Sequence, residues 1–221
     1  MITIMTMIIT PMNNETYLKQ INLKETDSLF VSLRTFAKEN NVPIITYEGM
    51  LFLKQLIALK HAKNILEIGT AIGYSALHMA STASHVQITT IERDESMIKL
   101  ALKHIENSTY KDQITLIKGD ALTVDLAVLN APFDLIFIDA AKAQSINFFE
   151  RFEPLLKEEG VIVTDNLLFH GLLFEENTSK NVKSLTKKID AFNQYLMTRN
   201  EYFSVIYPIG DGMSVSLKQK R

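Results

Sequence analysis

The residues best suited to chemistry are two aspartates, each at the end of an apolar run. Residues 135–139 end in Asp139, and residues 161–164 are followed by Asp165 and Asn166. If these runs are neighbouring parallel strands, their ends meet on one rim of a sheet. Two carboxylates and an amide oxygen suit a hard divalent cation such as Mg²⁺. Each aspartate could instead cap a following helix, but two such ends beside a glycine loop favour a site.

Lys142 follows Asp139 by three residues and is predicted to lie on the same rim. An ammonium group beside a metal ion gives up its proton more readily, so Lys142 is a candidate general base. The alternative is an ordinary surface lysine. The chain has no cysteine, which excludes thiol catalysis and zinc–thiolate sites.

A glycine loop follows the apolar run 64–68 and is a candidate ligand site. Gly69 lets the backbone leave a strand sharply, and Gly73 permits close approach to a ligand before Tyr74 and Ser75 begin a helix. Such a loop taken alone could be only a tight turn. Glu67, placed inside the apolar strand end, requires a further reason, because a buried carboxylate is costly.

Two more acidic residues extend the predicted ligand site. Glu92 ends the run 87–91, a position at which an acid accepts hydrogen bonds from ribose hydroxyls in nucleoside-binding folds. Gly119 and Asp120 follow the run 114–118 and could place a carboxylate near an adenine amino group. The loop lacks the dinucleotide fingerprint, so a nucleoside without a pyrophosphate fits better than NAD. A solvated strand end remains the alternative for Glu92 alone.

The elements that position these residues alternate between strand and helix. Strands are predicted at residues 64–68, 87–91, 114–118, 135–139 and 161–164, and helices at 74–83, 95–107, 121–129 and 145–156. This alternation indicates an α/β fold with a doubly wound, mostly parallel sheet and helices on both faces. A long helix near 181–200 precedes strands at 202–207 and 213–217, whose short turn makes the last strand antiparallel.

The N-terminal part is predicted to be an accessory region. Residues 1–12 form an apolar leader, expected to be poorly ordered, which lacks the features of a signal peptide or a membrane span. Helices are predicted near 15–23, 25–40 and 47–60, as an extension (13–60) of one domain covering 13–221. The net charge of −2 does not favour a strongly basic nucleic-acid binder. Separately, we expect a cytoplasmic protein.

These motifs together resemble the metal-dependent O-methyltransferases of the catechol and caffeoyl-CoA type. The resemblance is carried by residues 66–76 (LEIGTAIGYSA), 137–142 (FIDAAK) and 164–166 (TDN). It implies a Rossmann-like methyltransferase with a seven-stranded sheet, S-adenosylmethionine as cofactor and Mg²⁺ or another divalent cation. The implied metal ligands are Asp139, Asp165 and Asn166, and Lys142 and Asp139 are implied to be catalytic. The implied cofactor contacts are Ile44, which closes over the cofactor, with Glu67, Gly69, Tyr74, Ser75, Glu92, Gly119, Asp120 and Asp139.

A narrower resemblance concerns bacterial tRNA 5-hydroxyuridine methyltransferases, which form 5-methoxyuridine at the wobble position. It rests on residues 40–44 (NNVPI), 165–172 (DNLLFHGL), 188–193 (KIDAFN) and 208–212 (PIGDG). It implies a cytoplasmic homodimer that binds the tRNA anticodon loop. Four lysines between residues 180 and 188 could contact phosphates, or could form only a solvated helix face. The alternatives are a small catechol or phenolic substrate, and a nucleoside-binding regulatory module without turnover, against which the complete Asp139, Lys142, Asp165 and Asn166 set argues.

Overall fold

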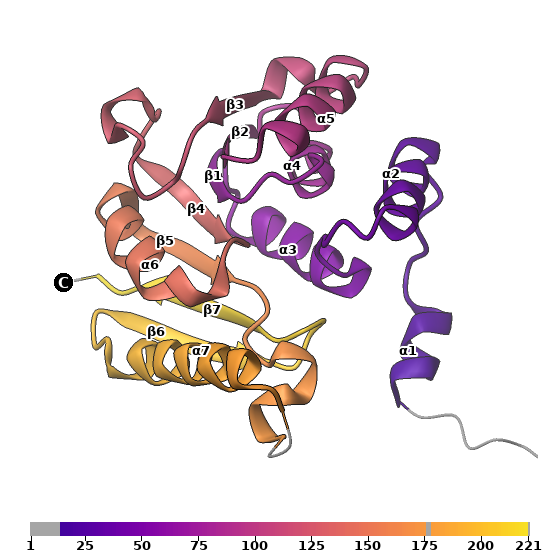
Figure 1. Ribbon diagram of the computed structural model, residues 1–221. Helices are drawn as coiled ribbons and strands as arrows, with labels where there is room; N and C mark the ends of the chain where they lie inside the picture. The colour runs from indigo at the N-terminus through magenta and orange to yellow at the C-terminus, as the bar shows by residue number, and fades with distance from the viewer. Residues whose placement is uncertain (1–13, 176–177, 221) are drawn as a thin grey trace, which may run out of the picture.

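One seven-stranded sheet organises the computed structural model, which describes residues 14–175 and 178–220. The strands run in the order β3-β2-β1-β4-β5-β7-β6 (Figure 1). They are β1 (Asn64–Ile68), β2 (Gln87–Glu92), β3 (Ile114–Lys118), β4 (Phe133–Ile138), β5 (Leu156–Thr164), β6 (Tyr202–Tyr207) and β7 (Met213–Lys218). The predicted fold class is confirmed. The apolar leader predicted at residues 1–12 lies outside the described residues.

The two faces of the sheet carry separate hydrophobic cores because successive residues of a strand point to opposite sides. Ile65 of β1 packs in the core with α2, α3, α4 and α5, whereas Leu66 and Ile68 pack in the core with α6 and α7. The helices are α1 (Asn14–Ile21), α2 (Ser28–Glu39), α3 (Tyr47–Leu59), α4 (Tyr74–Ala80), α5 (Glu95–Glu106), α6 (Ser145–Phe152) and α7 (Lys180–Thr198). Helices therefore cover both faces, as predicted.

The N-terminal helices form largely as expected, with one shifted boundary. Helix α2 begins at Ser28 rather than at Glu25, because Asp27 caps it by accepting a hydrogen bond from the backbone N–H of Leu29 at 2.9 Å. Thr46 caps α3 in the same way through Gly49. Figure 1 shows α1 standing apart from the sheet, while α2 and α3 lie beside α4.

The helix predicted at residues 121–129 is wrong. The structure has a turn followed by a short 3₁₀ helix at Leu126–Val128. The side chains of Asp120 and Asp125 each accept a backbone N–H two residues further on, and the Arg151 guanidinium binds two carbonyl groups of the segment. These side-chain hydrogen bonds satisfy the backbone in a non-helical path, which short acidic side chains favour.

The boundary between α6 and β5 also differs from the prediction. Helix α6 ends at Phe152 instead of continuing to 156, and a 3₁₀ turn that contains Pro154 follows it. Proline cannot donate the helical hydrogen bond, so the helix stops there. Strand β5 then begins at Leu156, five residues before the predicted start at 161, although only its C-terminal half is fully buried.

The C-terminal hairpin inserts its second strand into the sheet. Strand β7 lies between β5 and β6 and is antiparallel to both, with Val215 opposite Val163 on one side and Val205 on the other. The single antiparallel strand was predicted, but its position in the sheet was not. None of the helices in the described ranges is both long and apolar enough to cross a membrane.

Candidate active site

A cavity of about 670 Å³ opens at the carboxyl ends of β1, β2, β3 and β4. All predicted site residues line it except Glu67 and Asp165, which are buried behind its wall. The lining members of the predicted set are Ile44, Gly69, Tyr74, Ser75, Glu92, Gly119, Asp120, Asp139, Lys142 and Asn166. The predicted glycine loop and the predicted acidic rim are therefore two sides of one cavity.

Gly69 joins these two sides directly. Its φ is +101°, and a Cβ built on it would overlap the carbonyl oxygen of Asp139. No larger residue fits this contact without moving the backbone. The backbone N–H of Asp139 in turn donates to the carbonyl of Ile68 at 2.9 Å. The end of β1 and the end of β4 are consequently held in a fixed relation across the cavity floor.

Glu92 is held as a hydrogen-bond acceptor at the end of β2. Its Oε2 accepts the backbone N–H of Ala71 at 2.9 Å, and its Oε1 accepts the N–H groups of Arg93 and Asp94, each at 2.9 Å. This carboxylate thus links the glycine loop to the β2 end and lines the cavity. Its position suits recognition of hydroxyl groups on a ligand.

Asp120 also lines the cavity, at the end of β3, and is kept ionised. The backbone N–H of Leu122 donates to its Oδ1 at 2.9 Å, and Nη1 of Arg93 lies 3.0 Å from its Oδ2. These two hydrogen bonds lower the pKa of Asp120 below its usual value, with the Leu122 N–H contributing most. Arg93 also lines the cavity, and the sequence analysis did not identify it.

Glu67 lies beneath the glycine loop and is completely buried. Its Oε2 accepts a hydrogen bond from the Thr90 hydroxyl at 2.5 Å, and that hydroxyl lies 2.5 Å from the Thr70 hydroxyl. Burial raises the pKa of Glu67 to about 7, although hydrogen bonds from Ser75 and Thr90 act in the opposite direction. Glu67 therefore supports the loop from below and does not line the cavity.

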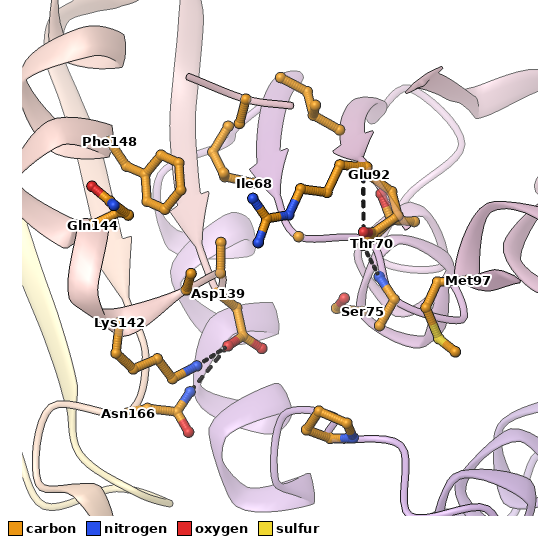
Figure 2. A pocket seen from close by; sticks show the side chains of 18 of the residues that line it. Ile68, Thr70, Ser75, Glu92, Met97, Asp139, Lys142, Gln144, Phe148 and Asn166 are labelled. Carbon is orange, nitrogen blue, oxygen red and sulfur yellow. Dashed lines mark hydrogen bonds and ion pairs between the residues drawn. The ribbon is translucent and has the colours of Figure 1, made fainter. Parts of the chain in front are cut away.

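The acidic rim brings together the four residues predicted from the strand ends. Figure 2 shows Lys142 and Asn166 both directed at Asp139. Nζ of Lys142 and Nδ2 of Asn166 each lie 3.0 Å from its Oδ1. Asp165, only 6% exposed, accepts the backbone N–H of Asn166 at 2.7 Å. Burial raises the pKa of Asp165 to about 7, and the charges of Asp139 and Asp211 add to this effect.

The rim has the chemistry of a divalent cation site, although it has only two acidic ligands. Among the described residues, no group of three or more histidine, aspartate or glutamate side chains is arranged to hold a metal ion. The third ligand would be the amide of Asn166, which a half-turn about its last side-chain bond would present as oxygen rather than nitrogen. The buried carboxylate of Asp165, whose pKa is raised beside Asp139, is a group that a cation would stabilise. The residues therefore fit such an ion.

Other cavity residues were not predicted. Residues 42–45, of which only Ile44 was predicted, form the wall contributed by the α2–α3 connection. Phe148 of α6 and Phe169 line the acidic side. Phe169 has a φ of +45°, a strained conformation that a phenylalanine adopts only when its surroundings require it. Its position three residues after Asn166 matches that of Lys142 after Asp139, and this spacing could have identified it.

Comparison with known proteins assigns the chain to a single family. A family model described as O-methyltransferase matches residues 19–219. A catechol O-methyltransferase from Niastella koreensis is 30% identical over 182 residues, which cover 79% of this chain and 81% of the relative. A caffeoyl-CoA O-methyltransferase from Populus kitakamiensis is 29% identical over 172 residues, covering 74% of this chain and 73% of the relative.

Solved structures agree in fold over nearly the whole chain. The crystal structure of a candidate caffeoyl-CoA O-methyltransferase from Staphylococcus aureus is 40% identical, with a TM-score of 0.83, and covers 91% of this chain and 95% of its own. An O-methyltransferase from Bacillus cereus in complex with SAH is 26% identical, with a TM-score of 0.79, covering 92% of this chain and 96% of its own.

Proposed function

Because this chain belongs to the O-methyltransferase family, we propose that it transfers a methyl group from S-adenosylmethionine to an oxygen of its acceptor with the help of a divalent cation. The observation that carries this proposal is the single cavity that joins the glycine loop to the Asp139 rim. A methyl donor on the first side and a cation-bound acceptor on the second would meet in that cavity.

The donor would occupy the side formed by the ends of β1, β2 and β3. Glu92, an acceptor fixed by three backbone N–H groups, is suited to bind ribose hydroxyls, and Asp120 is suited to accept a hydrogen bond from the adenine amino group. Gly69 and Ser75 would contact the amino-acid part. The Bacillus cereus relative in complex with SAH supports this ligand class.

The acceptor would bind at the acidic rim. Asp139, Asp165 and Asn166 would hold Mg²⁺ or a similar ion, which when bound would favour the deprotonated form of an acceptor hydroxyl. Both catechol and 5-hydroxyuracil offer two adjacent oxygens for such binding. Phe148 and Phe169 line the cavity on this side and could pack against the ring.

Lys142 is positioned to accept the proton of the acceptor hydroxyl. Its Nζ lies 3.0 Å from Oδ1 of Asp139, on the rim where the acceptor hydroxyl would bind. The hydroxyl proton would pass to Nζ, and the acceptor oxygen would form a bond to the methyl carbon as the sulfur–carbon bond breaks. The sulfonium would become a neutral thioether, and the positive charge would then reside on the protonated amine of Lys142.

We propose a tRNA wobble 5-hydroxyuridine as the acceptor, and the first half of α7 supports this choice. Four lysines there are exposed: Lys180, Lys183, Lys187 and Lys188. None takes part in an ion pair among the described residues. Cations near a helix N-terminus oppose the helix dipole, so helix stability does not explain Lys180 and Lys183. Phosphate binding would explain them.

An exposed aromatic ring lies in the segment that precedes these lysines in the sequence. Phe174, at the end of the 3₁₀ segment Phe169–Phe174, is 83% exposed, and aromatic rings of this kind stack on unpaired bases in single-stranded RNA. The α7 helix packs against this segment and against Lys142–Gln144, which places the helix beside the acidic rim. The expected homodimer and cytoplasmic location remain predictions.

A small catechol or phenolic acceptor is the second candidate. The relatives named as catechol and caffeoyl-CoA O-methyltransferases support it, because the same rim would bind either acceptor. The two candidates differ in whether contacts outside the cavity are needed, since a small phenol would be bound by the cavity alone.

An assay with two acceptors tests the proposal. The protein would be incubated with labelled S-adenosylmethionine, Mg²⁺ and either tRNA from cells lacking this protein or a catechol. We expect 5-methoxyuridine in the tRNA, no transfer with Asp139→Ala, and a rate lowered roughly 10²–10⁴-fold with Lys142→Ala. Labelling of the catechol alone would contradict the tRNA acceptor, and full activity in a chelator would contradict the metal role.

A further inference from the structure

A buried carboxylate lies beside the N-terminal end of α4, outside the site described above. Glu25 precedes α2, and its side chain is only 2% exposed. Its Oε1 lies 2.7 Å from Nε2 of His78. The Tyr74 hydroxyl donates to its two oxygens at 3.4 and 3.3 Å, and Nε of Arg34 lies 3.5 Å from Oε2. Glu25 thus connects the chain before α2 to two residues of α4.

This arrangement is not needed simply to hold α2 in place. Phe30 and Leu33 of α2 are already buried in the hydrophobic core with α4, and the Phe30 ring stacks on His78 with centroids 3.7 Å apart. Burial lowers the pKa of His78 to about 3 and raises the pKa of Glu25. A carboxylate beside a neutral imidazole in such a place is an expensive contact.

Buried polar contacts of this kind can fix one arrangement of two helices that apolar contacts alone would allow to slide. Both ends of α2 are connected to residues that line the cavity. Tyr74, the partner of Glu25, directly follows Gly73 and lines the cavity. At its other end, α2 leads into residues 42–45, which form the N-terminal wall of the same cavity.

We propose that Glu25 is a positioning residue for the donor side of the active site. By accepting the Tyr74 hydroxyl, it holds α2 on α4 in the register that places residues 42–45 against the cavity. The effect on ligand affinity rests on the proposed function, because it requires that the cavity bind S-adenosylmethionine and its product.

The test measures the affinity of the full chain for S-adenosylhomocysteine by calorimetry, together with the thermal midpoint of unfolding. Glu25→Ala is expected to weaken binding about tenfold, and Tyr74→Phe is expected to weaken it in the same direction. The double variant should lose less than the two single losses combined, because the residues act through one contact. Glu25→Gln, which keeps an acceptor for the Tyr74 hydroxyl, should retain most of the affinity.

Asp27→Ala is the matched control. It removes the cap of α2 and lowers the unfolding midpoint, but it leaves the contact with Tyr74 in place. We expect its affinity for S-adenosylhomocysteine to equal that of the wild type. Equal losses in Asp27→Ala and Glu25→Ala would show that only stability is involved and would overturn the proposal, as would unchanged affinity in Glu25→Ala.

Hydrogen exchange separates this inference from the proposed function. In the protein without ligand, Glu25→Ala should accelerate amide exchange at residues 42, 44 and 45 more than Asp27→Ala does. Unchanged exchange there would overturn the positioning role. If the wild type failed to bind S-adenosylhomocysteine, the proposed function would be wrong, and the exchange result would still decide whether Glu25 positions this wall.

Discussion

At the scale of single residues, two buried carboxylates lie next to the candidate site. Glu67 and Asp165 lie behind the cavity wall, and burial raises the pKa of each to about 7. Proteins seldom bury such groups without a use, because the charged form loses its hydration. Asp165 would be stabilised by a cation. The contacts of Glu67 are hydroxyl groups of the loop and of β2. This residue is expected to make the free energy of unfolding depend on pH.

The pH dependence of unfolding is expected to report on Glu67. Its pKa is about 7 in the folded protein, against 4.5 for an unperturbed glutamate, so between these values the folded protein binds a proton that the unfolded chain does not. Stability should therefore fall as pH rises from 5 to 8, by roughly 3 kcal/mol from this residue. Glu67→Gln should lower this slope in urea unfolding with a chelator present, and the slope that remains would include the contribution of Asp165, whose pKa burial also raises to about 7. An unchanged slope in this variant would contradict the assignment.

At the scale of elements, α7 has a lysine-rich first half and a second half that is packed in the core. Phe192 and Leu196 are buried, and Nδ2 of Asn193 donates to the carbonyl of Leu167 at 3.1 Å, just after the metal-ligand candidates. The helix is therefore fixed against the acidic side of the site. Under the proposed tRNA acceptor, its N-terminal lysines would contact the part of the acceptor that extends beyond the cavity.

Charge reversal on α7 tests this interpretation of the element. Lys183→Glu should weaken tRNA binding and lower the dependence of binding on salt by about one ion, because one phosphate contact is lost. Lys99→Glu is the control, since Lys99 is exposed on α5, which Figure 1 places at the opposite end of the sheet. Filter binding over a range of salt concentrations measures both. Equal effects of the two variants would indicate non-specific attraction, and methylation of a catechol should be unaffected by either.

At the scale of the whole molecule, a ligand in the cavity would couple distant parts of the chain. The cavity is lined by the α2–α3 connection, by the ends of β1 and β4, and by Asn166 after β5. A ligand that binds only the folded arrangement stabilises all of these together. The seven-stranded sheet provides the common frame, since the strand ends are fixed by its hydrogen bonds.

Thermal unfolding is expected to show this coupling. S-adenosylhomocysteine at a hundred times its dissociation constant should add about 2.7 kcal/mol of stability. For a chain of this size, that gain corresponds to a rise of roughly 5–10 °C in the midpoint. Scanning calorimetry with and without the ligand measures it, with adenine as a control that should act more weakly. No shift at saturating ligand would contradict the proposed donor site.

The sequence by itself determined the strand-end residues that meet in the site. Asp139, Asp165 and Glu92 follow apolar runs whose alternation with helices predicts parallel strands, and the ends of parallel strands share one edge. The glycine loop is equally local, because Gly69 and Gly73 act on the backbone at their own positions. Such local features can be predicted from the sequence because they depend on residues within one strand or one turn.

Only the tertiary structure decided the remaining features. Strand β7 lies between β5 and β6, residues 42–45 wall the cavity, and Glu25 reaches Tyr74, 49 positions away. The segment 121–129 is non-helical partly because Arg151 binds its carbonyl groups. Each of these depends on which segments pack together. Packing depends on the fit of whole surfaces, and periodicity along one segment carries no record of that fit.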